Sequence, residues 1–308
     1  SFPTRRSSDL PGFFGKEKSA GKCVCDCLFH IFNRCIDSRY TLFYICMRME
    51  KLSQLETAWA GKTCLCFDSL DSTQEYAKKL AGTESVHGTL ILAEEQTAGK
   101  GRRGRCWQSQ KGTTISMSLC LEPKLAVEHM AGVTLVMALA VAEAVREITG
   151  ADPLIKWPND IVVNGKKICG ILTELCFHNE KGIVIIGTGI NVNTDEFPEE
   201  IRDIAGSLKT ETGKEISREA LIASVLKYFE KFYEQYEKTE DLSLLKEQYE
   251  CMMANYNQWV HVLDPKQPYD GVAKGITDAG SLIVVREDGI KCEVYSGEVS
   301  VRGLYGYV

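Results

Sequence analysis

The sequence contains no run of about 18 consecutive apolar residues, the minimum for a helix that crosses a membrane. It also lacks an excess of positive charge, because 42 Asp and Glu outnumber 36 Lys and Arg and give a formal net charge of −6. Such a chain does not bind nucleic acid over its whole surface. Internal repeats and low-complexity tracts are absent as well. The 308 residues therefore predict a globular protein without a membrane segment, in which any binding of anions is local.

The thirteen cysteines lack the paired C-x2-C spacing of structural zinc sites. Five of them crowd the N-terminal region, at Cys23, Cys25, Cys27, Cys35 and Cys46. Their C-x-C-x-C spacing disfavours zinc, and we predict no metal site built from protein side chains. Most cysteines beyond residue 60 lie singly in apolar runs and resemble small core residues. This usage is typical of a reducing compartment, so we expect a cytoplasmic protein.

The first 46 residues show neither helical nor strand periodicity. Their opening, SFPTRRSSDL, resembles the peptide obtained when sequencing-adapter DNA is translated. We therefore interpret residues 1–46 as a non-native or disordered extension, with Met47 or Met49 as the true start. No small-residue cleavage site follows the apolar patches of this segment, which argues against a signal peptide. The remaining chain is predicted to form a catalytic domain at residues 47–257 and a small β domain at residues 258–308.

Local signals predict an α+β main domain, in which helices flank a mixed sheet. Ser72 is a candidate N-cap for a short helix that ends before Gly82, and Ser217 for a second, amphipathic helix. A long buried helix is expected over Ala126–Ile148, ending at Gly150. The expected strands and hairpin turns are Thr63–Phe67, Gly88–Gln96, Thr113–Glu122, Asn164-Gly165 and His178–Gly182. From Gln258 onward, short strands and turns predict a small all-β barrel.

The basic loop GKGRRGRCW, Gly99–Trp107, concentrates positive charge in this acidic chain. Its pattern matches the G-x-G-x-x-G dinucleotide fingerprint, but a strand follows where that motif requires a helix. A kinase would need V-A-I-K, H-R-D and D-F-G elements, which the sequence lacks, and a nucleic-acid patch would need interleaved aromatic residues. A solvated charged loop without a ligand remains the alternative. The cations are Lys100, Arg102, Arg103 and Arg105.

Two properties of the basic loop favour a ligand. Glycines allow the backbone to approach a bound molecule closely, and arginines bind phosphate and carboxylate oxygens through two parallel hydrogen bonds. Four neighbouring cations repel one another, so the loop is expected to move until an anion binds. The loop therefore predicts a lid that closes over a polyanionic ligand.

A second long motif, KWPNDIVVNGKKICGILTE at Lys156–Glu174, follows the basic loop. Together the two motifs resemble those of the biotin–protein ligases, and the resemblance runs in the same order from Thr63 to the C-terminus. It includes DSTQ at residues 71–74, GTGINVN at residues 187–193 and SGEVSVRG near the end. The chain is identified as a member of this family in its single-function form, without the N-terminal DNA-binding domain.

The resemblance implies a biotin/lipoate ligase-like, class II synthetase-like catalytic domain and an SH3-like C-terminal barrel. It implies that the enzyme forms biotinyl-5′-AMP from biotin and Mg-ATP. The biotinyl group then passes to one lysine of the biotin carrier domain of a carboxylase. The implied substrates and cofactor are thus biotin, ATP and Mg²⁺. The strand Thr113–Glu122 resembles a region that pairs subunits in dimeric relatives, so a homodimer is left open.

The resemblance also assigns residues to the site. The biotin-binding set is Ser72, Thr73, Gln74, Gln96, Lys100, Gly101, Arg102 and Lys167. The ATP-binding set is Arg102, Arg103, Arg105, Trp107 and Asn191. The catalytic set is Arg102, Lys156, Asp160 and Lys167, in which cations neutralise the meeting of two anions and Asp160 positions or deprotonates the acceptor lysine. The family more often has Arg at the position of Lys100, which leaves a two-pronged contact there in doubt.

Each assignment has a plain structural alternative. Ser72 and Thr73 are also suited to capping a helix, and Asp160 and Asn191 to closing turns. Three alternative functions for the whole chain stay open. They are a lipoate ligase with the same acyl-adenylate chemistry, a biotin-responsive repressor that binds DNA, and a non-catalytic binding module. Too few residues lie between Met47 and Asp71 for a winged helix-turn-helix, so no operator binding is expected.

Overall fold

The computed structural model describes residues 55–83, 85–179, 181–264 and 267–295, and the backbone of residues 300–303. All of them belong to one compact unit, Leu42–Val308. The predicted extension at residues 1–46, the two candidate start residues and the N-terminal cysteine cluster lie outside the described residues. Within the described part of the chain, no helix is both long and apolar enough to cross a membrane.

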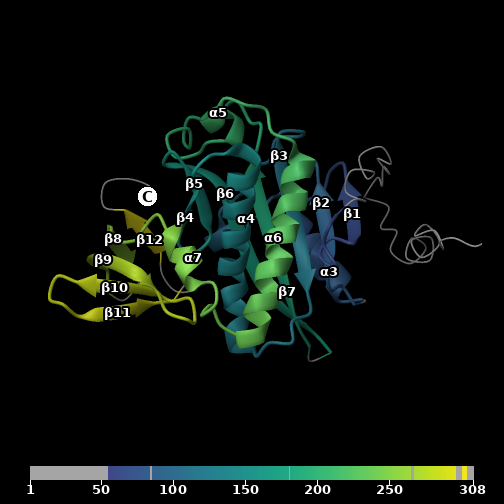
Figure 1. Ribbon diagram of the computed structural model, residues 1–308. Coiled ribbons are helices and arrows are strands. Elements are labelled where there is room, and N and C mark those ends of the chain that lie inside the picture. Colours follow the sequence, from purple (N-terminus) through teal and green to yellow (C-terminus); the bar gives the residue numbers. More distant parts are fainter. Residues whose placement is uncertain (1–54, 84, 180, 265–266, 296–299, 304–308) are drawn as a thin grey trace, which may run out of the picture. The chain divides into compact units, whose positions relative to one another are not determined.

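A seven-stranded sheet forms the centre of the main domain (Figure 1). Its spatial order is β1-β2-β3-β7-β6-β5-β4, with β1 and β2 parallel and all other neighbours antiparallel. The strands are β1 Thr63–Phe67, β2 Thr89–Ala93, β3 Thr114–Leu121, β4 Leu154–Lys156, β5 Asp160–Val163, β6 Lys166–His178 and β7 Lys181–Asn191. The mixed sheet confirms the predicted α+β class, and Asn164-Gly165 forms the predicted hairpin turn with φ angles of 50° and 79°.

The helices follow the predicted caps. The Ser72 hydroxyl accepts the Glu75 N–H at the start of α3, and the Gly82 N–H donates to the Leu80 carbonyl at its end. Ser217 caps the longest helix in the same way. The helices are α3 Thr73–Ala81, α4 Val133–Thr149, α5 Leu208–Thr212, α6 Arg218–Thr239 and α7 Lys246–Cys251, with 3-10 turns η1 Arg102–Gly104 and η2 Val127–Gly132.

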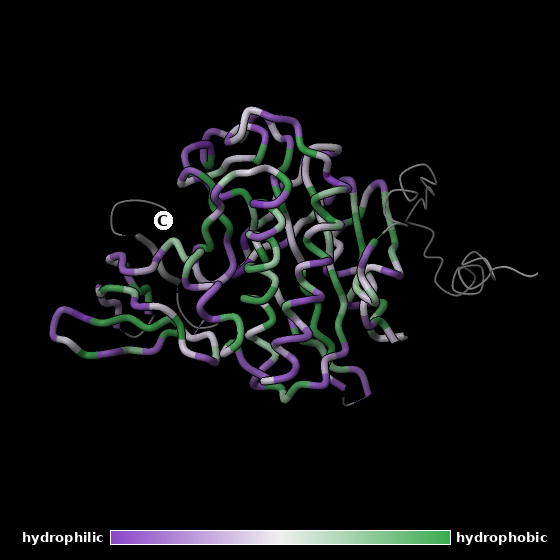
Figure 2. Tube along the Cα trace, in the orientation of Figure 1, coloured by the Kyte–Doolittle hydropathy of each residue, from purple (hydrophilic) through white to green (hydrophobic). Residues whose placement is uncertain are grey.

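The helix α4 is apolar on nearly all sides because it packs between the sheet and α6 (Figures 1 and 2). The Thr134 hydroxyl donates to Thr173 Oγ1 of β6 at 2.9 Å, so α4 covers the sheet face to which Thr173 points. Leu172 and its cross-strand partner Gly187 point the other way, because side chains alternate along a strand. Gln74 of α3 lies against Gly187. The helices α3 and α4 therefore pack on opposite faces of the sheet.

The main domain differs from the predictions in two respects. The long helix begins at Val133 rather than at Ala126, because residues Val127–Gly132 form the 3-10 turn η2. The short elements β4, α5 and α7 were not predicted. The strand β3 is hydrogen-bonded to β2 on one side and to β7 on the other, and all its residues are buried, so it has no free edge. A homodimer stays a prediction.

The C-terminal strands form a separate five-stranded antiparallel sheet with the order β11-β10-β9-β8-β12. Its strands are β8 Trp259–Leu263, β9 Tyr269–Ile276, β10 Leu282–Arg286, β11 Lys291–Val294 and β12 Ser300–Gly303. The buried indole of Trp157 donates through Nε1 to the Gly280 carbonyl at 3.1 Å, and its backbone N–H donates to Asn255 Oδ1. These bonds attach the turn between β4 and β5 to Asn255, just before β8, and to Gly280, between β9 and β10.

Candidate functional site

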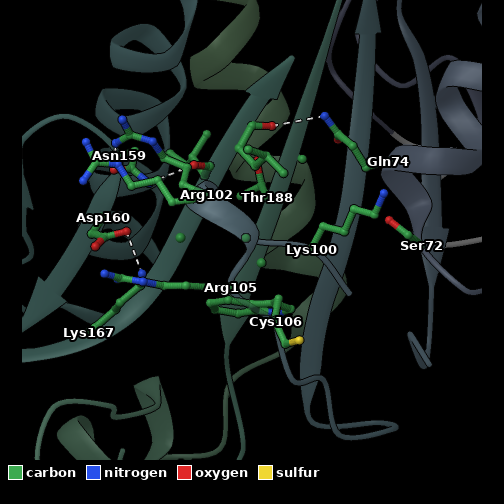
Figure 3. Close-up of a pocket in the computed structure, with 18 of the residues that line it drawn as sticks. Ser72, Gln74, Lys100, Arg102, Arg105, Cys106, Asn159, Asp160, Lys167 and Thr188 are labelled. Carbon is green, nitrogen blue, oxygen red and sulfur yellow. Dashed lines mark hydrogen bonds and ion pairs between the residues drawn. The ribbon is translucent and has the colours of Figure 1, made fainter. Parts of the chain in front are cut away.

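A pocket of about 720 Å³ lies on the sheet face that carries α3 (Figure 3). Of the residues predicted for the site, all but Asn191 line it. Six of the lining residues are cations: Lys100, Arg102, Arg103, Arg105, Lys156 and Lys167. Among the described lining residues, Asp160 alone carries a carboxylate. The fold thus gathers positive charge locally in a chain whose net charge is −6.

The basic loop Gly99–Trp107 joins β2 to β3 and folds back on itself. The Trp107 N–H donates to the Gly99 carbonyl at 2.9 Å, and the Gly101 N–H donates to the Arg105 carbonyl at 2.7 Å. Arg103 closes the turn in the left-handed region, with φ of 58°. A side chain at Gly99 would place its Cβ 2.3 Å from the Trp107 carbonyl oxygen. Glycine is therefore needed at this position for the two ends of the loop to approach.

Two side chains of the basic loop reach separate parts of the pocket wall. Lys100 Nζ pairs with Glu75 Oε1 of α3 at 2.8 Å. Arg102 Nη1 donates to Asn159 Oδ1, in the turn between β4 and β5, at 2.7 Å. The Asn159 amide in turn donates to the Ile171 carbonyl of β6 at 2.9 Å. The ligand-free loop is therefore held across the pocket at two points.

Burial lowers the pKa of the Arg102 guanidinium, and the neighbouring Arg103 and Arg105 lower it further, while Asp160 opposes them. Arginine stays protonated at neutral pH in spite of such shifts. The direction of the shift means that the positive charge of Arg102 is disfavoured in the ligand-free pocket. An anion beside Arg102 would relieve this cost, because opposite charges attract more strongly where water is excluded.

The motif around Asp160 places charged groups on the wall opposite α3. Lys156 and Asp160 are cross-strand partners of β4 and β5, so their side chains share one side of the hairpin. Lys167 Nζ pairs with Asp160 Oδ1 at 2.7 Å (Figure 3). Lys156 is only 6 % exposed. A buried lysine and a lysine–carboxylate pair thus stand beside Arg102.

Uncharged polar groups line the α3 side of the pocket. Gln96 Oε1 accepts the backbone N–H of Thr73 at 2.8 Å and its hydroxyl at 3.1 Å. The Gln74 amide donates to the carbonyls of Leu172 and Ile185. The hydroxyl of buried Ser118 bridges Thr73 Oγ1 and Gln74 Oε1. This fixed set of donors and acceptors is suited to an uncharged polar group of a ligand.

The Trp107 indole forms a flat apolar wall over two glycines. A Cβ at Gly189 of β7 would lie 2.3 Å from Trp107 Cε2, and a Cβ at Gly170 of β6 would lie 3.3 Å from Cζ3. Gly170 and Gly189 are cross-strand partners. The indole ring therefore lies directly on the backbone of two neighbouring strands, because glycine at both positions leaves room for it.

The structure separates Asn191 from the other predicted residues. It is 7 % exposed, and its amide donates to the Gly206 carbonyl at 3.1 Å. Its place favours the structural alternative, in which Asn191 holds the segment that precedes α5. The sequence reasoning missed Glu75 and Asn159, which hold Lys100 and Arg102. Both residues stand in or beside the quoted motifs, but their sequence positions do not reveal these pairings.

The described residues contain no group of three or more His, Cys, Asp and Glu side chains that could hold a metal ion. Mg²⁺ is commonly bound by one or two carboxylates together with substrate phosphates. Asp160 supplies one carboxylate and is already paired with Lys167. The side chains of the pocket therefore do not form a resident metal site.

Comparisons with known proteins agree with this site. A model of the biotin/lipoate A/B protein ligase family matches residues 66–191, and one of the biotin protein ligase C-terminal domain matches residues 257–302. The bifunctional ligase/repressor BirA of Bacillus subtilis is 38% identical over 250 residues, 80% of this chain and 76% of BirA. The biotin–[acetyl-CoA-carboxylase] ligase of Paracoccus denitrificans is 31% identical over 222 residues, 70% of this chain and 90% of that protein.

A solved structure supports the same relationship. The biotin protein ligase from Aquifex aeolicus in complex with biotin and ATP superposes with a TM-score of 0.68 and 33% sequence identity. The match covers 79% of this chain and 99% of that protein.

Proposed function

Because the chain belongs to the biotin protein ligase family, we propose that it activates biotin with ATP and transfers the biotinyl group to a lysine of a biotin carrier domain. The carrier domain would be that of a biotin-dependent carboxylase. One observation carries the proposal: among the residues that the structure describes, six cations and a single lysine-paired carboxylate line one pocket of an acidic chain. A site of this charge suits a reaction in which two anions must meet.

In the first step, a carboxylate oxygen of biotin attacks the α-phosphorus of ATP. The bond from phosphorus to the pyrophosphate oxygen breaks, and biotinyl-5′-AMP and pyrophosphate result. Arg102 and Lys167 lie on the same wall of the pocket and neutralise the oxygens that come together, with Lys156 beside them. Loss of one such preorganised group typically lowers a rate about 10²–10³-fold. Arg103 and Arg105 bind the remaining phosphate oxygens, and Trp107 provides a flat surface for the nucleotide.

In the second step, the neutral amine of the acceptor lysine attacks the acyl carbon of the adenylate. The bond from the acyl carbon to the phosphate oxygen breaks, and AMP leaves. Asp160 accepts the proton of the incoming amine or orients it. In the ligand-free site its carboxylate is held by Lys167 at 2.7 Å. A bound adenylate gives Lys167 another anionic partner, which frees an Asp160 oxygen for the amine.

The uncharged polar end of biotin is assigned to Thr73, Gln74 and Gln96, whose donors and acceptors are fixed by one another and by Ser118. Ser72 caps α3 and also lines the pocket, so both of its predicted roles are compatible. Gly101 lets the loop backbone lie close to the acyl chain. Asn191 receives no ligand contact in this proposal. Mg²⁺ would enter bound to the phosphates of ATP, and no step above depends on a protein-bound metal.

Isotopic exchange of pyrophosphate into ATP tests the first step directly. We expect exchange that depends on biotin and not on lipoate, because the C-terminal family model is that of biotin protein ligases. Lys167→Ala should lower the exchange rate about 10²–10³-fold, since it removes a cation from the reacting centre. Lys181→Ala, an exposed lysine on the next strand, is the matched control and should keep the wild-type rate.

The second step is tested by mass. The protein is incubated with biotin, ATP and a biotin carrier domain, and the acceptor should gain the mass of one biotinyl group. Exchange supported by lipoate would favour the lipoate ligase alternative. Near-normal turnover of Lys167→Ala would remove Lys167 from the mechanism. The absence of operator binding stays a prediction, and a salt-dependent, sequence-specific gel shift would contradict it.

A further inference from the structure

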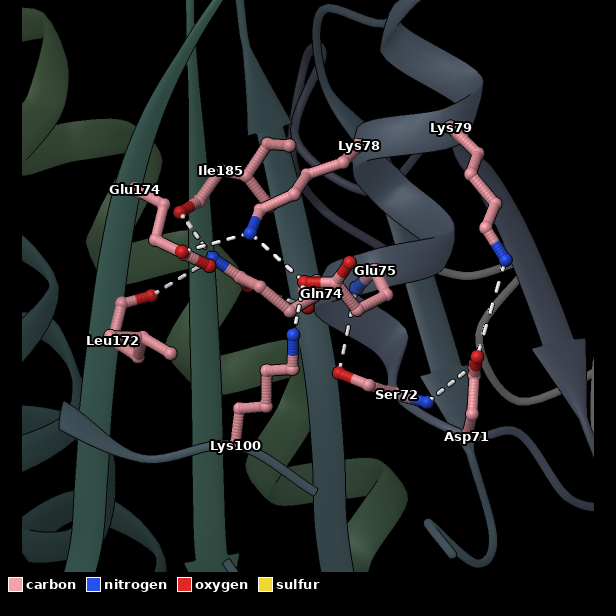
Figure 4. A network of polar contacts seen from close by, with 11 residues as sticks. Asp71, Ser72, Gln74, Glu75, Lys78, Lys79, Lys100, Leu172, Glu174 and Ile185 are labelled. Atoms are coloured by element: carbon pink, nitrogen blue, oxygen red, sulfur yellow. Dashed lines mark hydrogen bonds and ion pairs between the residues drawn. The ribbon is translucent and has the colours of Figure 1, made fainter. Parts of the chain in front are cut away.

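An ion-pair network at the edge of the pocket joins the basic loop to α3 and β6 (Figure 4). Glu75 Oε1 accepts from Lys100 Nζ at 2.8 Å and from Lys78 Nζ at 2.9 Å. Lys78 Nζ also pairs with Glu174 Oε1 of β6 at 2.8 Å. Glu75 is therefore the shared acceptor between a lysine of the loop and a lysine of the helix.

We propose that Glu75 is a positioning residue, which anchors the basic loop to α3 through Lys100 and thereby holds the loop across the pocket. Lys100 and Arg102 are two residues apart, yet Lys100 reaches α3 and Arg102 reaches the turn between β4 and β5. The loop is thus fastened on both sides. Arg102 keeps its place over the reacting centre only while the Lys100 end is also fixed.

The base of α3 gives this anchor a rigid support. Gln74, the residue before Glu75, is hydrogen-bonded to the carbonyls of Leu172 in β6 and Ile185 in β7. The Glu75 backbone N–H donates to the Ser72 hydroxyl at the helix start. A carboxylate on such a support can fix a lysine that enters from a glycine-rich loop, whose own backbone is pliable.

The lysine at position 100 fits an anchor better than a ligand contact. Lysine offers a compact charge on a flexible stem and lacks the planar fork with which arginine grips carboxylates and phosphates. The inference rests on the proposed function only for its effect on catalysis. The position of the loop in the ligand-free protein can be measured without any enzyme activity.

Loss of the Glu75 charge has an asymmetric effect on its two partners. Lys78 keeps Glu174, whereas Lys100 loses the ion pair with Glu75 and faces the Lys78 ammonium group. The repulsion pushes the loop away from α3. An exposed ion pair of ordinary strength shifts a two-state population about two- to five-fold, and the loop should open by this factor.

Limited trypsin digestion of the ligand-free full chain measures the opening, because trypsin cleaves after the arginines of the loop. Peptide masses report cleavage after Arg102, Arg103 and Arg105. We expect Glu75→Gln to raise the cleavage rate at these sites about two- to five-fold, and Glu75→Asp to restore much of the protection. The double variant Glu75→Gln/Lys100→Gln should be cleaved no faster than the faster single variant, because both changes break one pair.

Asp68→Asn is the matched control. Asp68 pairs with Lys111 at 2.7 Å, and that pair is likewise partly exposed, somewhat more so than the pair of Glu75 and Lys100. Its loss should leave cleavage of the loop unchanged. High salt, about 1 M, should bring the wild type toward the rate of Glu75→Gln, since salt screens exposed charges. If Glu75→Gln acted only by altering α3, high salt would not bring the cleavage rate of the wild type toward that of the variant.

Steady-state kinetics test whether the anchor positions the loop for the ligand. If the loop occupies its ligand-binding position for a smaller fraction of the time, the apparent affinity for ATP falls by the same factor. Glu75→Gln should therefore raise the KM for ATP about two- to five-fold with kcat unchanged. Unchanged cleavage in Glu75→Gln would overturn the anchor. Increased cleavage with an unchanged KM would overturn the positioning role. A wild type without biotin-dependent activity would refute the proposed function and leave the cleavage result standing.

Discussion

The cradle beneath Trp107 gives the sharpest test of how the pocket is built. Gly189→Ala would place a Cβ 2.3 Å from Trp107 Cε2 and 2.6 Å from Cζ2 and Nε1. Carbon atoms prefer separations of about 3.5–4.0 Å, so the ring must retreat by more than about 1 Å. The strand cannot yield instead, because Gly189 is paired with Ser116 of β3 and with Gly170 of β6.

The cost of this clash should appear mainly in catalysis. Trp107 belongs to a loop and is half-buried, so it can move without disrupting the core. We expect the free energy of unfolding to fall by less than the ~1–3 kcal/mol of an overpacked core. A misplacement of about 1 Å at a reacting centre can cost about 10²-fold in rate, and pyrophosphate exchange should fall by 10- to 100-fold.

Two companion variants make the test specific. Gly182→Ala inserts the same methyl group into the same strand, where its Cβ would meet the flexible end of Met130 at 2.8 Å, and it should leave exchange unchanged. Trp107→Ala removes the whole indole, including the atoms that collide. Adding Gly189→Ala to Trp107→Ala should therefore cost little more activity. Wild-type exchange in Gly189→Ala, or strict additivity of the two changes, would refute the reasoning.

Two further predictions concern stability. Buried Glu230 of α6 accepts the backbone N–H groups of Ala58, Trp59 and Ala60 at 2.6–2.8 Å. Glu230→Gln should therefore lower the free energy of unfolding, measured in urea, by about 1–3 kcal/mol. The control Glu234→Gln, at an exposed position of the same helix, should change that free energy by less than about 0.5 kcal/mol. Hydrogen bonds from Lys100 and Lys78 hold the pKa of Glu75 below its usual 4.5. The contribution of the ionised Glu75 to the free energy of unfolding is therefore fully present above pH 4.5 and is lost as the pH falls through the lowered pKa. The difference in unfolding free energy between wild type and Glu75→Gln, at most about 1 kcal/mol, should therefore vanish in acid, and a constant difference would contradict the pairing.

Elements with their own start and stop signals could be predicted from the sequence. The strand β1 and the helix α3 occur at the expected residues, because β1 is a short run of β-type residues and Ser72 and Gly82 bound α3. Short elements had no such signal. The strand β4 has three residues, and it forms because β5 and the segment at Met252–Ala254 offer it partners. A strand of three residues is too short to show hydrophobic alternation in the sequence.

The same distinction, between features with a sequence signal and features without one, applies to the functional site. The sequence motifs identified which side chains gather in the pocket, because each motif carries several of them at a fixed spacing. They did not identify what holds those side chains. Glu75 and Asn159 acquire their roles from Lys100 and Arg102, which lie 25 and 57 positions away along the chain. Asn191 is the predicted residue that does not line the pocket, and its amide donates to the Gly206 carbonyl.

The pairings explain how an acidic protein can keep six of its described cations together in one pocket before a ligand binds. Lys100 is neutralised by Glu75 and Lys167 by Asp160, both at less than 3 Å, while Arg102 is held by a neutral amide. An anion that binds at Lys167 must compete with Asp160, whereas the pair of Lys100 and Glu75 is the more exposed of the two. A bound adenylate would replace Asp160 as the partner of Lys167 and release that carboxylate, while Glu75 continues to hold Lys100 and the basic loop. The pair of Lys167 and Asp160 therefore stabilises the empty site and gives way to the ligand, whereas the pair of Lys100 and Glu75 holds the loop in both states.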